Sequence, residues 1–257
     1  MITNAQTGTN VAEIAPGIYR INTPVAEIPG GFSFNQFLIV DDEPLLFHTG
    51  LRRMFPLVQE AIARVMPVEK LRYIAFSHFE SDECGALNQL LAVAPNAVPL
   101  CSRVAAMVSV SDFADRPPRA MNDGEHLSLG KREVVWVDAP HIPHGWETGY
   151  LFDATTRTLF AGDIFTQGGS QNAPIVETDL VEPADAFRVG FAVPLGLPDS
   201  WAHLTDSEPI IEKLASLGAT TLANMHGSAW SGGSETAASM LRELARRVAA
   251  TGVPTAA

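Results

Sequence analysis

Side chains that can bind metal lie in four well-separated segments of this chain, and any fold that uses them together must bring these segments to one place. The densest segment reads Ser77-His78-Phe79-Glu80-Ser81-Asp82-Glu83-Cys84-Gly85. On an extended backbone, side chains two residues apart point to the same side, so alternate positions of this segment can face one site. The candidate ligands are His78, Glu80, Asp82, Glu83, His144, Asp163 and His226. We therefore expect a metal site built from loops at strand ends.

The donor types restrict the choice of metal. Imidazole suits iron and zinc, while carboxylate oxygen suits manganese and other hard cations. An oxygen-rich set that keeps two or more histidines favours iron, with zinc or manganese as alternatives.

Length and composition describe an ordinary globular domain. The chain has 257 residues, of which 46% are hydrophobic and 18% charged. A chain of this size can bury roughly three quarters of the surface that it exposes when unfolded, so it needs neither metal nor disulfide merely to fold. Its net charge of −12 argues against nucleic acid as a partner, because phosphate contacts need clustered lysine and arginine.

The sequence also predicts a cellular location. No apolar run approaches the roughly 20 residues that span a bilayer, so a membrane is not expected as a partner. Residues 1–10 are polar and lack the basic and then apolar pattern of a signal peptide. The two cysteines, Cys84 and Cys101, cannot build a disulfide framework. We therefore expect a cytoplasmic protein.

Short apolar strands alternate with amphipathic helices along the chain, which predicts an α/β fold in one domain, 1–257, without a flexible linker. Strands are predicted at 17–21, 36–40, 45–47, 73–76, 98–101, 133–137, 149–152, 158–160 and 221–223. Helices are predicted at 54–65, 85–93, 103–110, 208–216 and 234–249. Residues 41–44 read as a hairpin turn and 153–157 as a second tight connection.

The order and spacing of the ligand candidates resemble the metal site of the flavodiiron branch of the metallo-β-lactamase superfamily. The shared pattern is His-x-Glu-x-Asp, a histidine about sixty residues later, an aspartate after about eighteen more, and a last histidine after about sixty. Residues 14–20 resemble the opening strand of that superfamily, and Leu159-Phe160-Ala161-Gly162-Asp163 resembles its bridging aspartate strand. The resemblance covers about 11–230 and implies a four-layer αβ/βα sandwich.

The resemblance implies a role for each ligand candidate. His78, Glu80 and His144 would bind the first metal, Asp82 and His226 the second, and Asp163 both. Hydrolytic members of the superfamily typically have a histidine where Glu80 stands, which gives a nitrogen-rich site for zinc. A carboxylate there favours the higher oxidation states of iron. The implied cofactor is therefore a pair of iron ions.

Three features depart from the family pattern. Glu83 stands where a histidine is usual, and we predict that it binds the second metal. His48 stands where an aspartate is usual, so it is a candidate for a supporting contact beneath the metal loop. Flavodiiron proteins of the full type continue into a flavodoxin-like module that binds FMN, whereas this chain ends at Ala257. We therefore expect no FMN in this chain, as in the stand-alone oxygen-binding di-iron proteins.

These expectations lead to one main function and two alternatives. The main prediction is a di-iron protein that binds, senses or reduces O2, or NO, with an external flavoprotein or rubredoxin-like electron donor if it is an enzyme. The first alternative is a metal-dependent hydrolase acting on a thioester, phosphodiester or lactone, with Asp82 handling the proton. The second is a metal-free fold that serves as an interaction module. The sequence leaves a homodimer open.

Several other residues could contribute to the site. His126 and His203 are predicted to be ordinary surface or hydrogen-bonded histidines. His141 competes with His144 as a ligand, and His144 is preferred because its spacing to Asp163 matches the family. Cys84 is given no catalytic role. The aromatic residues nearest to the ligands, predicted either to wall a small dry pocket or to pack in the core, are Phe79, Trp146, Phe165 and Trp230.

Overall fold

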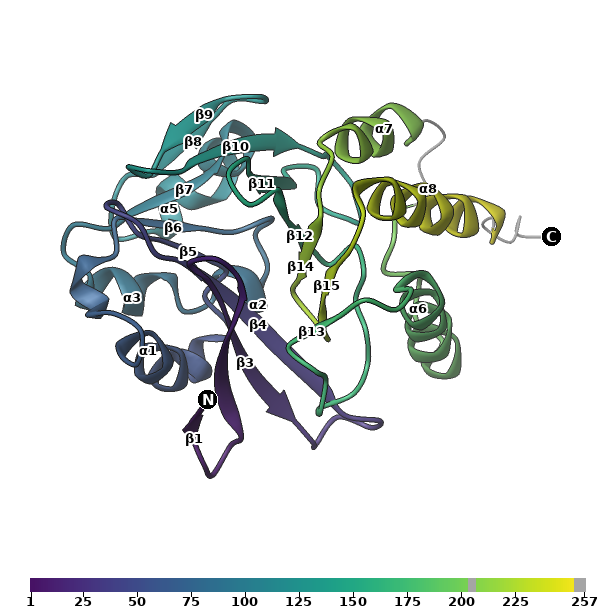
Figure 1. Cartoon of the computed structure of the whole chain (residues 1–257), viewed down its shortest axis with the longest axis horizontal. Coiled ribbons are helices and arrows are strands. Elements are labelled where there is room, and N and C mark those ends of the chain that lie inside the picture. Colours follow the sequence, from purple (N-terminus) through teal and green to yellow (C-terminus); the bar gives the residue numbers. More distant parts are fainter. Residues whose placement is uncertain (203–206, 252–257) are drawn as a thin grey trace.

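Two mixed β-sheets lie face to face between two layers of helices (Figure 1). The computed structural model describes residues 1–202 and 207–251. The first sheet has the strand order β1 to β8, antiparallel from β1 to β5 and parallel from β5 to β8. Its strands are β1 (Ile2–Asn4), β2 (Thr9–Ala15), β3 (Ile18–Val25), β4 (Phe32–Ile39), β5 (Leu45–Phe47), β6 (Tyr73–Ala75), β7 (Val98–Ser102) and β8 (Arg119–Met121).

The second sheet has the order β13-β15-β14-β12-β11-β10-β9. Its strands are β9 (His126–Ser128), β10 (Glu133–Asp138), β11 (Gly149–Asp153), β12 (Thr158–Gly162), β13 (Ile175–Val176), β14 (Thr221–Asn224) and β15 (Ala229–Ser231). Strands β12 and β14 are parallel, and β10 runs in the same direction because β11 is antiparallel to both β10 and β12. The carboxyl ends of β10, β12 and β14 therefore meet at one edge of this sheet.

The helices cover the outer faces of the sheets. Those of the first half are η1 (Arg52–Met54), α1 (Phe55–Ala63), η2 (Val68–Lys70), α2 (Ser81–Cys84), α3 (Leu87–Val93), α4 (Arg103–Ala105), η3 (Ala106–Val110) and α5 (Ser111–Phe113). The second half contributes α6 (Val181–Leu195), α7 (Glu208–Ser216) and α8 (Ser234–Ala250).

Three apolar clusters separate these four layers. One joins α1 and α3 to the first sheet and includes Ile62 and Leu90. The second lies between the sheets, where Phe37 meets Phe160. The third joins α7 and α8 to the second sheet. Two sheets that each bury both faces require this arrangement, so the predicted four-layer αβ/βα sandwich is confirmed.

Most predicted elements are present, with boundaries shifted by a few residues. The strand at Leu45–Phe47 and the helix at Glu208–Ser216 have the predicted bounds, and both predicted turns join antiparallel strands. The segment 14–20 is not a single strand: β2 ends at Ala15, and β3 begins at Ile18 after a turn in which Gly17 has φ +71°. The helix expected at 85–93 is present as α3, which begins two residues later at Leu87, and the short helix α2 before it was not predicted. Helix α6 was not predicted.

Among the described residues, no helix combines the length and the apolar character needed to cross a bilayer.

Candidate metal centre

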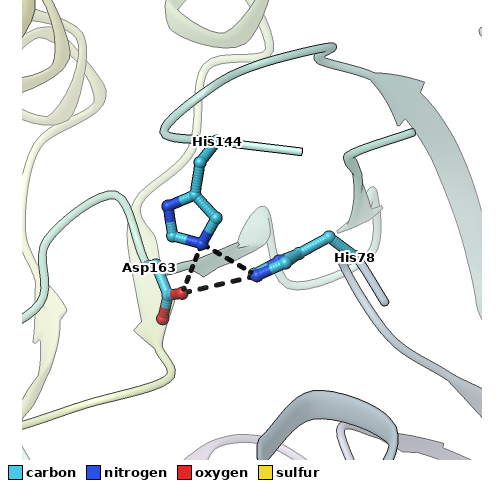
Figure 2. Close-up of side chains that lie close together, drawn as sticks. All are labelled: His78, His144 and Asp163. Carbon is cyan, nitrogen blue, oxygen red and sulfur yellow. Dashed lines mark hydrogen bonds and ion pairs between the residues drawn. The ribbon is translucent and has the colours of Figure 1, made fainter. Parts of the chain in front are cut away.

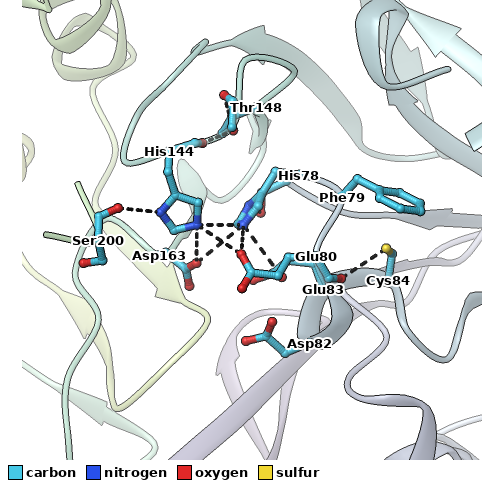
Figure 3. Close-up of polar contacts among 12 residues, drawn as sticks. His78, Phe79, Glu80, Asp82, Glu83, Cys84, His144, Thr148, Asp163 and Ser200 are labelled. Carbon is cyan, nitrogen blue, oxygen red and sulfur yellow. Dashed lines mark hydrogen bonds and ion pairs between the residues drawn. The ribbon is translucent and has the colours of Figure 1, made fainter. Parts of the chain in front are cut away.

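All seven predicted ligands converge at one rim of the sandwich, where strands end. Figure 3 labels six of them, all except His226. His78 and Glu80 follow β6, and the short helix α2 carries Asp82 and Glu83. The second sheet supplies the remaining three from its common edge: His144 after β10, Asp163 directly after β12, and His226 after β14. Segments that are far apart in sequence therefore meet because the strands that precede them end at neighbouring positions.

Two histidines and Glu80 form the first donor group. The Nε2 atoms of His78 and His144 lie 3.0 Å apart. Glu80 Oε2 lies 3.1 Å from His78 Nε2 and 3.3 Å from His144 Nε2. The two rings are nearly perpendicular, and their Nε2 atoms point toward the same place as Asp163 (Figure 2). Three donor atoms this close can bind one cation.

Asp163 lies between the two donor groups and presents a different oxygen to each. Its Oδ2 is 3.6 Å from His144 Nε2 and 3.8 Å from His78 Nε2. Its Oδ1 is 3.2 Å from His226 Nε2. This is the geometry that a carboxylate bridging two metal ions requires.

The second donor group combines His226 with Asp82 and Glu83, whose nearest donor atoms all lie within 4.8 Å of one another. His226 Nε2 is 3.3 Å from Asp82 Oδ2. Both His226 and Glu83 are buried, whereas Asp82 is half-buried. Carboxylates outnumber imidazoles in this group, so it is the more oxygen-rich of the two.

Hydrogen bonds behind the histidines hold each Nε2 toward the site. His144 Nδ1 donates to the Ser200 carbonyl at 2.8 Å, and His226 Nδ1 donates to the Ser33 carbonyl at 2.9 Å. His78 Nδ1 lies 3.0 Å from Ser77 Oγ, which in turn lies 3.0 Å from His48 Nε2. A ring that donates through Nδ1 keeps the Nε2 lone pair for a metal. His48 therefore makes the supporting contact that its position suggested.

The charges in this cluster perturb one another strongly. Burial alone would lower the pKa values of His144 and His226, but hydrogen bonds to carboxylates raise them to about 9 and about 10. Hydrogen bonds from His144 and His78 lower the pKa of Glu80 to about 2. Burial would raise the pKa of Asp163, yet the surrounding histidines hold it well below its usual range. Without metal, protonated histidines neutralise these carboxylates.

Glu83 is not neutralised in this way, and it provides the test of whether a metal pair fits. Its side chain has no exposed surface, and no hydrogen-bond donor among the described residues pairs with either carboxylate oxygen; the carboxyl of Asp82 can share a hydrogen bond with it only if one of the two is protonated. Burial, followed by the charges of Asp163 and Asp82, raises its pKa well above the usual range. A buried carboxylate without partners is costly unless a cation accompanies it. The donor set therefore fits two metal ions.

The structure corrects the prediction that the segment from His78 to Asp82 is extended and presents alternate side chains to the site. Glu80 is extended, with φ −132° and ψ 161°, but the chain turns into α2 at Ser81. Asp82 and Glu83 thus reach the site from the first turn of a helix. The turn is needed because the first sheet ends at β6, and a straight continuation would carry Asp82 away from His226.

The structure also bears on the predictions for the other histidines and for Cys84. The side chain of His141 is exposed and belongs to none of the donor groups, which agrees with the choice of His144. His126 is exposed and lies 2.7 Å from Glu133, as expected of a surface histidine. His203 lies outside the described residues. Cys84 is buried, and burial raises its pKa to about 12, so it stays a thiol near neutral pH.

None of the four aromatic residues nearest to the ligands lines the cavity at the donors, so they do not wall the pocket; the alternative prediction, packing in the core, is confirmed for two of them. Phe165 and Trp230 are in the core, Trp146 is largely exposed, and Phe79 faces a separate groove. The cavity, about 400 Å³, is instead walled by Phe32 and by residues of α6 and the segment after it. Phe32, α6 and the segment after it are distant in sequence from every ligand candidate, so no sequence motif indicated that they would wall the cavity.

A stack of aromatic rings connects this wall to the second donor group. Phe32 stacks on His226 with ring centres 4.3 Å apart, Phe187 stacks on Phe32 at 5.4 Å, and Phe191 on Phe187 at 5.5 Å. The only guanidinium among the described lining residues, that of Arg188, is paired with Asp185 and Asp199. The cavity therefore offers apolar walls and no uncommitted arginine or lysine among those residues.

Known proteins share both the sequence pattern and the fold. The chain is 29% identical over 142 residues to the nitric oxide reductase of Moorella thermoacetica and 30% identical over 141 residues to the rubredoxin-oxygen oxidoreductase of Megalodesulfovibrio gigas. These alignments cover 53% and 54% of this chain. In each case the aligned part is 35% of the relative, so the chain spans about a third of the length of these proteins.

Solved structures extend the likeness in fold to almost the whole chain. The rubredoxin oxygen:oxidoreductase of Desulfovibrio gigas superimposes with a TM-score of 0.77 at 20% identity, covering 93% of this chain and 61% of that one. The flavodiiron protein of Giardia intestinalis gives 0.74 at 19% identity, covering 93% and 59%. The model of the family described as ODP family beta lactamase matches residues 32–189, which is more than half of the sequence. The chain therefore belongs to the ODP family, within the flavodiiron-like branch of the metallo-β-lactamase superfamily.

Proposed function

We propose that this chain is a non-haem di-iron protein that binds or reduces O2 or NO. One observation carries the proposal: four carboxylates and three imidazoles converge in two groups that share Asp163. His78, Glu80 and His144 would hold the first iron, Asp82, Glu83 and His226 the second, and Asp163 both. The relatives named nitric oxide reductase and rubredoxin-oxygen oxidoreductase support redox chemistry over hydrolysis.

The side chains around the donors suit a small neutral ligand. Two bound irons would supply the electrons for reducing the gas. The aromatic wall of Phe32 and Phe187 limits the water beside the donors, and the ion pairs of Arg188 leave it unsuited to anchor a substrate anion. Among the seven ligand candidates Glu80 has the most exposed side chain, about half accessible, so solvent reaches the donors at this residue.

We further propose that electrons come from a separate flavoprotein or rubredoxin-like donor, as the name of one relative suggests. The cytoplasm is the proposed location, since the two buried cysteines remain unpaired in the structure.

The direct test combines metal analysis with gas exposure. Protein purified without chelator is expected to contain iron, and anaerobically reduced, iron-loaded protein is expected to change its visible spectrum when O2 or NO is admitted. His126→Ala, on the surface, is the matched control and should respond like the wild type. Iron-loaded protein that is spectrally silent toward both gases would refute the proposal. So would zinc-loaded protein that hydrolyses nitrophenyl phosphates or esters with many turnovers.

A further inference from the structure

Glu83 faces both donor groups of the metal centre. Its donor atoms lie within 4.8 Å of those of His78 and Glu80, and also within 4.8 Å of those of Asp82 and His226. Its Oε2 is 3.8 Å from His78 Nε2, the central donor of the first group (Figure 3). Apart from Asp163, no other candidate ligand in the described chain contacts donors of both groups in this way.

We propose that Glu83 is a second bridging carboxylate, which binds one metal ion through each oxygen and lies beside the bridge of Asp163. This inference rests on the proposed dinuclear centre and goes beyond it, because a residue at this position was expected to serve the second metal alone.

The surroundings of Glu83 support two bonds rather than one. Both of its oxygens are buried, and no hydrogen-bond donor among the described residues pairs with them; the neighbouring carboxyl of Asp82 can share a hydrogen bond with Glu83 only if one of the two is protonated. A terminal ligand bound through a single oxygen would leave the other as a buried acceptor without a donor, which is unfavourable. A bridge satisfies both oxygens at once.

Charge supports the same assignment. Glu80, Asp82, Glu83 and Asp163 together carry four negative charges, which match two divalent cations. An imidazole in place of Glu83 would leave the buried pair one positive charge in excess. Charges deep in a protein are stable only when they are compensated. A carboxylate at position 83 that binds both metal ions supplies the missing negative charge to both.

The position of α2 explains how Glu83 reaches both groups. Asp82 and Glu83 are adjacent on the first turn of this helix, so their side chains diverge by about 100° around its axis. Asp82 faces His226, while Glu83 points inward beneath His78. A histidine at position 83 could place only one ring nitrogen on a metal, because its two nitrogens point in divergent directions.

Three variants that each remove one carboxylate charge separate bridging from electrostatics. Crystals of metal-free Glu83→Gln, Asp82→Asn and Glu80→Gln protein would be soaked anaerobically in limiting Fe²⁺, and the iron occupancy at each position measured by anomalous scattering. Glu83→Gln should lower occupancy at both positions, corresponding to roughly 10-fold to 100-fold weaker binding at each. Asp82→Asn should lower mainly the second position and Glu80→Gln mainly the first.

Direct distances provide the complementary result. In iron-loaded wild-type crystals, one Glu83 oxygen should lie within bonding distance of each iron. The proposal is overturned if both oxygens bind one iron, if Glu83→Gln empties only the second position, or if all three variants weaken both positions equally. Should Glu83→Gln fail to fold, Glu83→Asp, shorter by one methylene, should still lose one of the two bonds. Occupancy is read without any gas reaction, so a failure here is distinct from a failure of the proposed activity.

Discussion

At the scale of single residues, His48 shows how a buried group can support a ligand without touching a metal. His48 is fully buried, and burial lowers its pKa to about 3, so its ring is neutral at physiological pH. If His78 Nδ1 donates to Ser77 Oγ, the serine hydroxyl can donate its own proton to His48 Nε2. This chain of hydrogen bonds fixes the ring of His78.

Replacing His48 with alanine should therefore weaken the first metal position selectively. Loss of such a supporting contact typically lowers metal affinity roughly 10-fold to 100-fold. Competition with a chromophoric chelator should show one weakened and one nearly unchanged iron per chain in His48→Ala, while the surface variant His126→Ala keeps both affinities. Equal weakening of both positions would instead indicate a general loss of stability and would contradict this role.

From sequence, a motif that fixes both residue type and spacing predicted which side chains converge at the site. His144 and Asp163 could be chosen in this way, although His141 lies only three residues from His144. The position of Glu83 between the two donor groups could not be predicted, because it depends on where α2 starts relative to β14. Likewise, Phe32 and Phe187 reach His226 only through tertiary packing, and neither lies near a motif.

At the scale of elements, local sequence predicts best where one pattern dominates. Helix α8 has a regular apolar face and begins at the predicted Ser234. Short strands such as β1, β8 and β13 are defined by pairing with a neighbour rather than by their own residues, so sequence could not predict them. Helix α6 contains Gly190 and Pro194, both poor helix formers, and depends on tertiary contacts such as Arg247 with Glu182.

The junction of α2 and α3 depends on Gly85. A Cβ atom at this position would lie 2.2 Å from the Ser81 carbonyl oxygen, closer than real contacts allow, and 3.0 Å from the Arg52 backbone nitrogen, which is tighter than most real contacts. Gly85→Ala should therefore shift α2 and the two carboxylates that it carries. We expect a loss of roughly 1–3 kcal/mol in the free energy of unfolding, as for other overpacked sites, measured by urea denaturation of metal-free protein.

The same variant should also bind less iron at the second position, since Asp82 and Glu83 move together. Gly190→Ala is the matched control for a glycine: like Gly85 it has no positive φ, but a Cβ there meets open space, so it adds the same methyl group without crowding. Iron binding in Gly190→Ala should be normal. Wild-type stability and iron content in Gly85→Ala would show that the close approach is unimportant.

Helix α6 controls the size of the cavity through Phe187. Truncation to alanine removes the ring that stacks on Phe32 and widens the space beside His226. In ferrous-loaded protein, the affinity for n-butyl isocyanide divided by that for methyl isocyanide should be at least about 10-fold higher in Phe187→Ala than in the wild type. This change in the ratio corresponds to about 1.4 kcal/mol. Phe113→Ala, in the separate groove, should leave this ratio unchanged. An unchanged ratio in Phe187→Ala would show that the aromatic wall does not select ligands by size.

At the scale of the whole molecule, the metal centre joins the two sheets. The first sheet supplies four donors through β6 and α2, and the second supplies His144, Asp163 and His226. The apolar cluster between the sheets aligns the two rims, and its alternating residues were predictable from sequence. The sequence could not predict that the two rims meet, because this depends on the strand register within each sheet and on the angle at which the sheets cross. Metal binding should therefore stabilise the packing of one sheet on the other.

This coupling gives stability a dependence on pH that differs between metal-free and metal-loaded protein. In the metal-free fold, the pKa values of His144 and His226 are raised from 6.5 to about 9 and about 10. A raised pKa contributes stability that is complete below 6.5 and disappears as pH rises through the folded value. The raised pKa of Glu83 acts in the same direction. The lowered pKa values of Glu80 and Asp163 act only below about 4.5, outside this range.

Metal binding reverses this trend, because the imidazoles must lose their protons before their Nε2 atoms can bind. Between pH 6.5 and 8.5 the melting temperature of metal-free protein should fall, while the increase caused by saturating iron under anaerobic conditions should grow. Differential scanning calorimetry at several pH values measures both, and proton release on loading can be followed in weak buffer. In the double variant His144→Asn/His226→Asn, the metal-free slope should become shallower, because only the contribution of Glu83 remains. If the melting temperature of metal-free protein rises across this range, these histidines are not the groups that release protons when metal binds.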